Sequence, residues 1–313
     1  MMPSSTNGAA VITTGSAAQT AAEQAARLHR LPAFAGVDVI AVTAGTNGFL
    51  TALANPTDRW LSSEVADVFG RPVQVSWLLR TEGTAVIDAT QLLTALPGTA
   101  DRNLSAVATS YGLGQLLQRA RSLGAHTVIV GAAGFPGADA ASGALNAAGA
   151  KLAVANGSGL KVGANELAHI LTFTPAEPKA QPHVILLCDT DQPLAQIAGI
   201  DDARRLFAAL VNPYNPNVTP ESPRTGAYDG LAFGFACAFN ATLVDATGFG
   251  VQLHDPESSV RHAQLVIGGP EQIATFSRVY DTLDGRTITF TADVIGPENA
   301  REIAATFATL RKG

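Results

Sequence analysis

The sequence has few cysteines and no long hydrophobic run. Two cysteines, Cys188 and Cys237, in 313 residues are too few for a disulfide framework or a cysteine zinc site, so a reduced cytoplasmic protein is expected. No stretch of about 18 apolar residues is free of charges and turn formers, which argues against a membrane span. The N-terminus, MMPSSTNGAA, lacks the basic start and apolar core of a signal peptide. Residues 1–8 are predicted to be a disordered tail.

Basic clusters are also missing from the sequence. The formal net charge is −6 and the sequence pI is about 5.5, so no nucleic-acid-binding surface is expected. Charged residues make up only 15% of the chain and hydrophobic residues 47%, which favours an α/β protein with buried sheets over a disordered chain. The length suffices for two domains.

Predicted strands and helices alternate in the first part of the chain. Strands over 9–12 and 37–42 alternate with helices over 17–30 and 49–54, an order that predicts a parallel sheet with right-handed crossovers. Further along, the pattern predicts a hairpin over 74–89, helices over 110–123, 140–148, 231–241 and 298–310, and buried strands over 127–130, 184–188 and 265–267. Ligands of open α/β sheets bind at the carboxyl ends of the strands, so the loops that follow the strands are the candidate sites.

The first candidate loop lies in VIVGAAGFPGADAASGALNAAG, residues 128–149. Small residues at the start of a helix can let a phosphate approach backbone N–H groups. The segment contains neither GxxxxGK[ST] nor GxGxxG, the phosphate-binding patterns of nucleotide sites. A tight strand-to-helix turn with close packing explains the same residues, and both interpretations remain open.

The second candidate loop is Cys188-Asp189-Thr190-Asp191. Two acids placed two residues apart at a strand end put at least one carboxylate in the crevice. Such a carboxylate can hold Mg²⁺ through water or accept a hydroxyl proton, and it can equally cap a helix or form a turn. Asp229, just before the apolar helix that begins near Leu231, is expected to cap that helix.

Several motifs, in this order, resemble those of the type 1 glycerate kinases. Residues 84–88, TAVID, resemble the family's TAVIEMA, residues 109–116, TSYGLGQL, its TTYGTGELI, and residues 188–194, CDTDQPL, its CDVDNPL. Residues 128–143 lie where the family has IVIGIGGSATNDGGAG, residues 226–236 are similar to GAAGGLGFAL, and residues 263–267 to ADLVITGEG. The chain is therefore identified as a divergent member of this family with eroded active-site motifs.

The resemblance implies a two-domain α/β fold. A Rossmann- or flavodoxin-like parallel sheet domain would be built from both chain ends, residues 9–55 and 263–313. An α/β domain over residues 56–262 would be inserted between them, with the active site in the cleft. The expected partner is a small hydroxy acid, and a homodimer is compatible with the family.

The resemblance also implies an activity and its residues. The family transfers the γ-phosphoryl group of ATP to glycerate with Mg²⁺, which requires cations on the phosphates, a metal-holding carboxylate and a positioned hydroxyl. Asp189 and Asp191 are the expected catalytic and metal-binding residues. A phosphate or substrate loop is expected from this set: Ser16, Gly134, Asp139, Gly143 and Gly226.

The sequence departs from the family at most of the polar positions. Where the family has VIAPDSFKGSL, the Asp and Lys positions hold Gly15 and Ala18, and only Ser16 is kept. In the family's ADGGEGT stretch, Ala44 and Asn47 replace the Asp and the Glu. In GGSATNDGG only Gly134 and Asp139 are kept, and the serine is Phe135; GEGRID becomes GGPEQI over 268–273, without its Glu and Arg. Each lost charged contact would cost on the order of 10²- to 10³-fold in rate, although such contributions are not additive.

Three hypotheses follow. The first is a degenerate glycerate kinase with weak or lost catalysis that binds a small molecule or regulates another protein. The second is an active Mg-ATP-dependent kinase of glycerate or a related hydroxy acid, with a rebuilt site. Its missing cation would be one of Arg102, Lys161, Arg204 or Arg224, and a structure with no cation near Asp191 would count against it. The third is an unrelated small-molecule-binding or regulatory α/β protein, which a topology without the inserted domain would favour.

Overall fold

The computed structural model describes residues 10–13, 21–41, 49–94, 107–154, 163–176, 181–198, 201–246, 263–268, 288–291 and 294–310. The chain divides into two compact units. The first joins both ends of the chain, Met1–Leu53 and Ala246–Gly313, and the second is the continuous segment Ala54–Asp245. The domain edges expected from the sequence, 55/56 and 262/263, remain predictions, because residues 247–262 lie outside the described ranges.

The first unit is built on a four-stranded sheet in the order β12-β11-β1-β2, in which every neighbouring pair is parallel. Its strands are β1 (Ala10–Thr13), β2 (Asp38–Ala41), β11 (Ala263–Gly268) and β12 (Ile288–Thr291). Its helices are α1 (Ala21–Leu28), α2 (Phe49–Leu53) and α10 (Pro297–Leu310). The first strand of the chain therefore lies between β2, its neighbour in sequence, and β11, which comes from the far end.

Apolar side chains from both chain ends form the core of the first unit. Val11, Leu265 and Ile267 of the sheet pack with Leu28 and Phe307 of the helices. The rings of Phe34 and Phe307 stack with centroids 4.9 Å apart. Because each segment alone would leave its apolar side exposed, burial in this shared core holds the two ends of the chain together.

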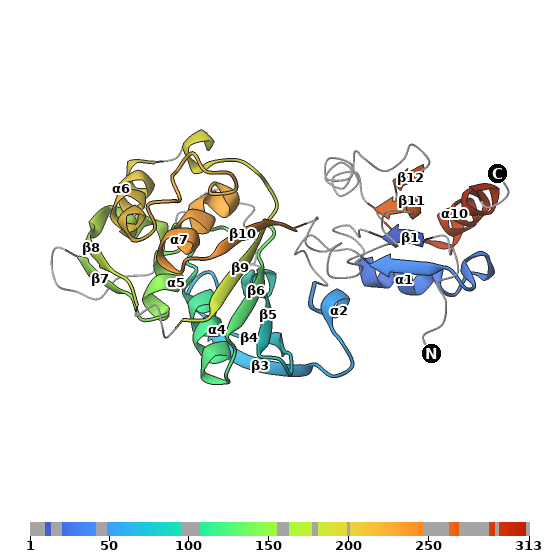
Figure 1. Ribbon diagram of the computed structural model, residues 1–313, viewed down its shortest axis with the longest axis horizontal. Helices are drawn as coiled ribbons and strands as arrows, with labels where there is room; N and C mark the ends of the chain where they lie inside the picture. Colours follow the sequence, from blue (N-terminus) through green and yellow to red (C-terminus); the bar gives the residue numbers. More distant parts are fainter. Residues whose placement is uncertain are drawn as a thin grey trace. The chain divides into compact units, whose positions relative to one another are not determined.

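The second unit is built on a six-stranded sheet in the order β10-β9-β6-β5-β4-β3 (Figure 1). The pairs β10-β9, β9-β6 and β6-β5 are parallel, whereas β5-β4 and β4-β3 are antiparallel. The strands are β3 (Arg59–Ala66), β4 (Pro72–Leu79), β5 (Thr84–Asp88), β6 (Thr127–Gly131), β9 (His183–Cys188) and β10 (Thr242–Asp245); β7 (Lys151–Val154) and β8 (Ile170–Thr174) pair separately. This mixed architecture with a parallel-dominated sheet confirms the α/β fold class.

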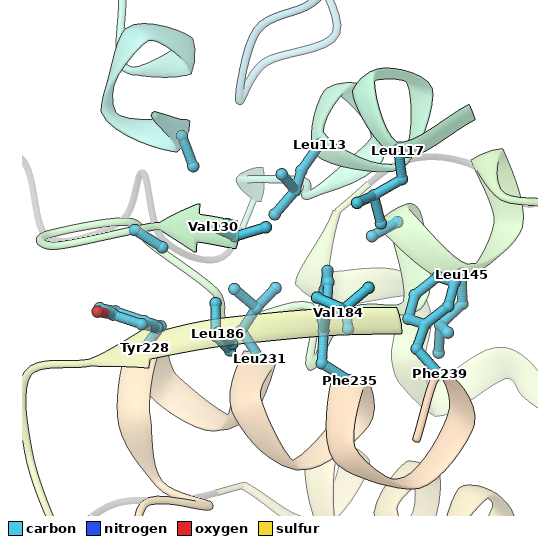
Figure 2. Packing of buried hydrophobic residues seen from close by; sticks show 14 of the residues in the cluster. Leu113, Leu117, Val130, Leu145, Val184, Leu186, Tyr228, Leu231, Phe235 and Phe239 are labelled. Carbon is cyan, nitrogen blue, oxygen red and sulfur yellow. The ribbon is translucent and has the colours of Figure 1, made fainter. Parts of the chain in front are cut away.

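Four α-helices in the described part of the second unit connect and cover its strands. They are α4 (Tyr111–Ser122), α5 (Ser142–Ala147), α6 (Asp202–Val211) and α7 (Leu231–Ala238). Figure 2 shows Leu113 and Leu117 of α4 and Leu231 and Phe235 of α7 in one buried cluster with the strand residues Val130, Val184 and Leu186. The α7 helix is buried along nearly its whole length, which explains why its sequence is apolar on every side. No helix in the described ranges is long and apolar enough to cross a membrane.

The expected cap of α7 is wrong. The helix begins after Gly230, with no side-chain capping hydrogen bond. Tyr228, Asp229 and Gly230 all have positive φ, at 57°, 54° and 99°. This left-handed turn, rather than the Asp229 carboxylate, leads the chain into the helix.

Candidate functional site

The carboxyl ends of the parallel strands meet at one edge of the six-stranded sheet. Asp88 of β5 pairs in register with Gly131 of β6, Gly131 with Leu187 of β9, and Cys188 with Asp245 of β10. The two loops predicted as sites, 131–143 and 188–191, both start at this edge. In a parallel sheet this edge is where ligands bind, so the expected loops are brought together within the second unit.

Asp139 lies at the centre of the first loop and is fully buried. Its Oδ2 accepts hydrogen bonds from the N–H of Ser110 at 2.7 Å, the hydroxyl of Ser110 at 2.9 Å and the N–H of Gly143 at 3.2 Å. Its Oδ1 accepts from the N–H of Ala141 at 3.2 Å. Burial raises the pKa of Asp139, and the donors from Ser110, Gly143 and Ala141 oppose that shift. The retained acid therefore ties the loop to the start of α4 and is not open to a ligand.

Ser110 links this carboxylate to the next helix, because its hydroxyl also accepts from the N–H of Ala144 at 2.9 Å. We expect Ser110→Ala to lower the free energy of unfolding by about 1 to 2 kcal/mol, since a buried donor and acceptor lose their partner. Urea denaturation followed by circular dichroism would measure it. Ser122→Ala is the matched control, because the Ser122 hydroxyl is exposed and donates to Arg119 O within its own helix, and should cost less than about 0.5 kcal/mol. Equal effects of the two variants would contradict the link.

The glycines of the expected loop serve turn geometry and close packing. Gly134 has φ +73° with open space around it, a conformation that side chains rarely adopt. A Cβ on Gly143 would lie 2.4 Å from Thr109 Oγ1 and 2.8 Å from Asp139 Oδ2, and one on Gly226 would lie 2.7 Å from Gln192 O. Gly134, Gly143 and Gly226 therefore fit the tight-turn interpretation. Ser16 lies outside the described residues.

Side chains fill the loop where the family sequence has glycine and serine. Phe135 is buried in the core together with Ala140, Ala141 and Tyr228. Ala140 and Ala141 keep positive φ, at 47° and 71°, although they stand where the family has two glycines. The Tyr228 hydroxyl donates to Leu187 O at 2.6 Å. A left-handed alanine costs roughly 1–2 kcal/mol, so surrounding packing enforces this conformation.

Asp191 forms an ion pair with Arg224, with Oδ1 and Nε 2.9 Å apart. The Arg224 N–H also donates to Asp191 O at 3.1 Å, and Arg224 has φ +69°. The Asp191 side chain is 71% exposed and that of Arg224 is 31% exposed. The structure therefore places one of the four expected cations beside the acid. Arg204 instead pairs with Asp201 at 3.6 Å, and Arg102 and Lys161 lie outside the described residues.

Asp189 is exposed as a residue, two positions before Asp191. The chain around its carboxylate displaces water and raises its pKa, and the like charge of Asp229 adds to the shift. Within the described ranges no three His, Cys, Asp or Glu side chains group closely enough to hold a metal ion. Mg²⁺ commonly takes one or two carboxylates and completes its shell with water and phosphate oxygens. Asp189 and Asp191 fit a magnesium ion only in that mode.

Asp88 is a buried acid at the same edge that the site prediction missed. It is 4% exposed and accepts from the N–H of Thr90 at 3.0 Å and from the Thr90 hydroxyl. Burial raises the pKa of Asp88 to about 6. A signal was present in the sequence: the residue ends the TAVID strand at a position where the family has an acid, Glu.

The fold and these loops define an α/β protein whose candidate site lies at the carboxyl edge of a parallel-dominated sheet. The glycerate kinase family model matches residues 12–209, more than half of the chain. A glycerate kinase of Bacillus subtilis is 25% identical over 281 residues, covering 81% of this chain and 72% of that protein. An uncharacterized protein of Synechocystis sp. is 27% identical over 248 residues, covering 72% of this chain and 66% of that protein.

A solved structure supports the fold. The crystal structure of a protein assigned as glycerate kinase 2 from Salmonella typhimurium superposes with a TM-score of 0.71, at 17% identity, over 98% of this chain and 100% of that one. The chain belongs to the glycerate kinase family. Its match spans about two thirds of the length of the Synechocystis relative. Family membership removes the third hypothesis, an unrelated protein that mimics the motifs.

Proposed function

We propose that this chain is a glycerate-kinase-like protein that binds a small hydroxy acid and has weak or lost ATP-dependent phosphoryl transfer. The observation that carries the proposal is the burial of Asp139, the acid retained in the first loop, whose carboxylate accepts from the N–H and the hydroxyl of Ser110. This acid is therefore not open to a metal ion or a substrate. Phosphoryl transfer depends on positioning and on cations directed at the phosphates, and the expected cation Arg224 is paired with Asp191.

A working kinase with a rebuilt site is the second candidate, and the same ion pair favours it. The pair places the guanidinium of Arg224 beside Asp191. A rebuilt kinase site needs such a cation near this acid. Arginine is suited to phosphate oxygens, and the phosphates of bound ATP would compete with Asp191 for Arg224. Asp189 and Asp191 would then hold Mg²⁺, which supplies charge neutralisation at the phosphates when bound.

The first experiment is a coupled assay of the purified chain with Mg-ATP, D-glycerate and related hydroxy acids. We expect turnover no greater than that of Asp191→Asn, because that exchange removes the candidate metal carboxylate with little change in shape. Turnover that Asp191→Asn abolishes, and that Arg224→Ala lowers by about 10²-fold or more, would overturn the proposal and establish the second candidate. Arg121→Ala on the exposed side of α4 is the control for loss of an arginine. The expected homodimer remains a prediction, and sedimentation of the same samples would measure it.

A further inference from the structure

A cavity lies in the second unit, between α6, the segment 194–195 and the segment 220–221. Its volume is about 350 Å³, near the lower end of the roughly 300–1,000 Å³ of small-molecule sites. Leu194 and Ala208 are buried, and with Ala209 and Pro220 they give the cavity an apolar lining. An occupant must therefore be small and carry an apolar portion.

Two opposite charges also line this cavity. Arg205 of α6 and Glu221 of the facing segment both contribute to its wall, and both residues are exposed. The ion pairs found among the described residues join other side chains, so neither Arg205 nor Glu221 is held by an ion pair there. The carboxylate of a bound molecule would lie near the guanidinium of Arg205, and the ammonium of a bound molecule would lie near the carboxylate of Glu221.

We propose that this cavity binds a small zwitterion with an apolar side chain, of the α-amino acid type. An anion alone would be repelled by Glu221, and a cation alone by Arg205. A zwitterion satisfies both charges while its apolar side chain covers Leu194 and Ala208. Charge-assisted hydrogen bonds are stronger than neutral ones, so both ends of the ligand would contribute to binding.

The residues that line the cavity differ from those proposed for the kinase site. Both sets nevertheless lie on the same two segments of the chain. The segment 189–196 provides Asp191 before it reaches Leu194, and the segment after Pro220 provides Arg224. The two segments are bonded to each other by Ala195 N–H to Pro220 O at 2.9 Å and by Leu194 N–H to the Thr225 hydroxyl at 2.9 Å. These hydrogen bonds fix the backbone of the cavity wall, which reduces the conformational entropy lost when a ligand binds.

Titration calorimetry with L-leucine and L-phenylalanine as probes tests the proposal. We expect saturable binding of at least one probe with Kd of about 1 mM or tighter. 4-Methylpentanoate and isopentylamine, which each keep one of the leucine charges, should bind at least about tenfold more weakly. If neither amino acid binds saturably, or if the singly charged analogues bind equally well, the proposal that the cavity binds a zwitterion is overturned.

Two charge variants locate the binding. Arg205→Ala and Glu221→Gln should each weaken probe binding by about tenfold or more, and both change exposed side chains, so neither should prevent folding. Arg121→Ala and Glu64→Gln remove the same kinds of charge elsewhere on the unit and should leave the Kd unchanged. Binding that is indifferent to Arg205 and Glu221 would place the probe elsewhere and refute the assignment. Because the readout is binding without ATP, its outcome is independent of the kinase assay.

Discussion

Replacing Asp139 by alanine should lower the free energy of unfolding of the second unit by about 4 kcal/mol or more. The variant leaves the N–H groups of Ser110, Ala141 and Gly143 buried without their acceptor. A buried donor that loses a charged partner costs roughly 1–3 kcal/mol, and removal of one side of a buried charged network costs about 3–5 kcal/mol. Alanine also removes the cost of burying a carboxylate. This gain offsets only part of the loss, because the three N–H groups remain buried without an acceptor.

Urea denaturation followed by circular dichroism measures this effect, with Asp202→Ala as the matched control. Asp202 is exposed in the first turn of α6, so its loss should cost less than about 0.5 kcal/mol. Asp139→Asn covers the case in which the alanine variant does not fold. It keeps one oxygen and sets an amide N–H against a backbone donor, so an intermediate loss of about 2 kcal/mol is expected. An Asp139→Ala protein as stable as the control would show that the carboxylate does not hold the loop.

Replacing Asp88 by asparagine should stabilise the protein at pH 8. The pKa of Asp88 is about 6 in the folded chain, against a reference value of 3.8. Between these values the folded state binds more protons than the unfolded state, so this acid's contribution to stability falls as the pH rises from about 4 to about 6. Above pH 6 the buried charge costs about 2 to 3 kcal/mol. Asparagine removes that charge and still accepts from Thr90.

The difference in unfolding free energy between Asp88→Asn and the parent protein should therefore grow from near zero at pH 4 to about 2 to 3 kcal/mol at pH 8. Urea unfolding at a series of pH values measures this difference, in which the other titrating groups cancel. Asp202→Asn, which changes an exposed acid, is the matched control. A flat difference for Asp88→Asn would mean that the folded pKa of this carboxyl is not raised.

The sequence predicted best the parts of the fold that are buried on both sides. The strands ending at Asp88, Gly131 and Cys188 are continuous apolar runs, which is the pattern of central parallel strands, and their bounds were predicted to within one residue. The edge strand Arg59–Ala66 was not predicted, because its residues are mostly exposed or half-buried and show little alternation. The helix Asp202–Val211 was also missed, although Asp201 accepts from Arg204 N–H as its cap.

The sequence predicted which loops form the candidate site, but it did not predict which side chains interact within those loops. Motif order identified the loops that follow β6 and β9. The left-handed backbone at Ala140 and Ala141 could not be read from the sequence, because alanine has no preference for it and only tertiary packing enforces it. The pairing of Asp191 with Arg224 depends on contacts between distant segments, which local patterns do not contain.

The way the chain is shared between the two units determines the order in which they can be completed during synthesis. Residues 54–245 form one continuous unit, so all of its strands are synthesised before β11 and β12. The four-stranded sheet of the first unit is completed later, because β1 pairs with both β2 and β11. A nascent chain can form the β1-β2 pair early, but its other edge stays open until Ala263–Gly268 emerges. An open parallel edge of this kind is prone to wrong pairing, so the first unit is exposed to misfolding for longer than the second.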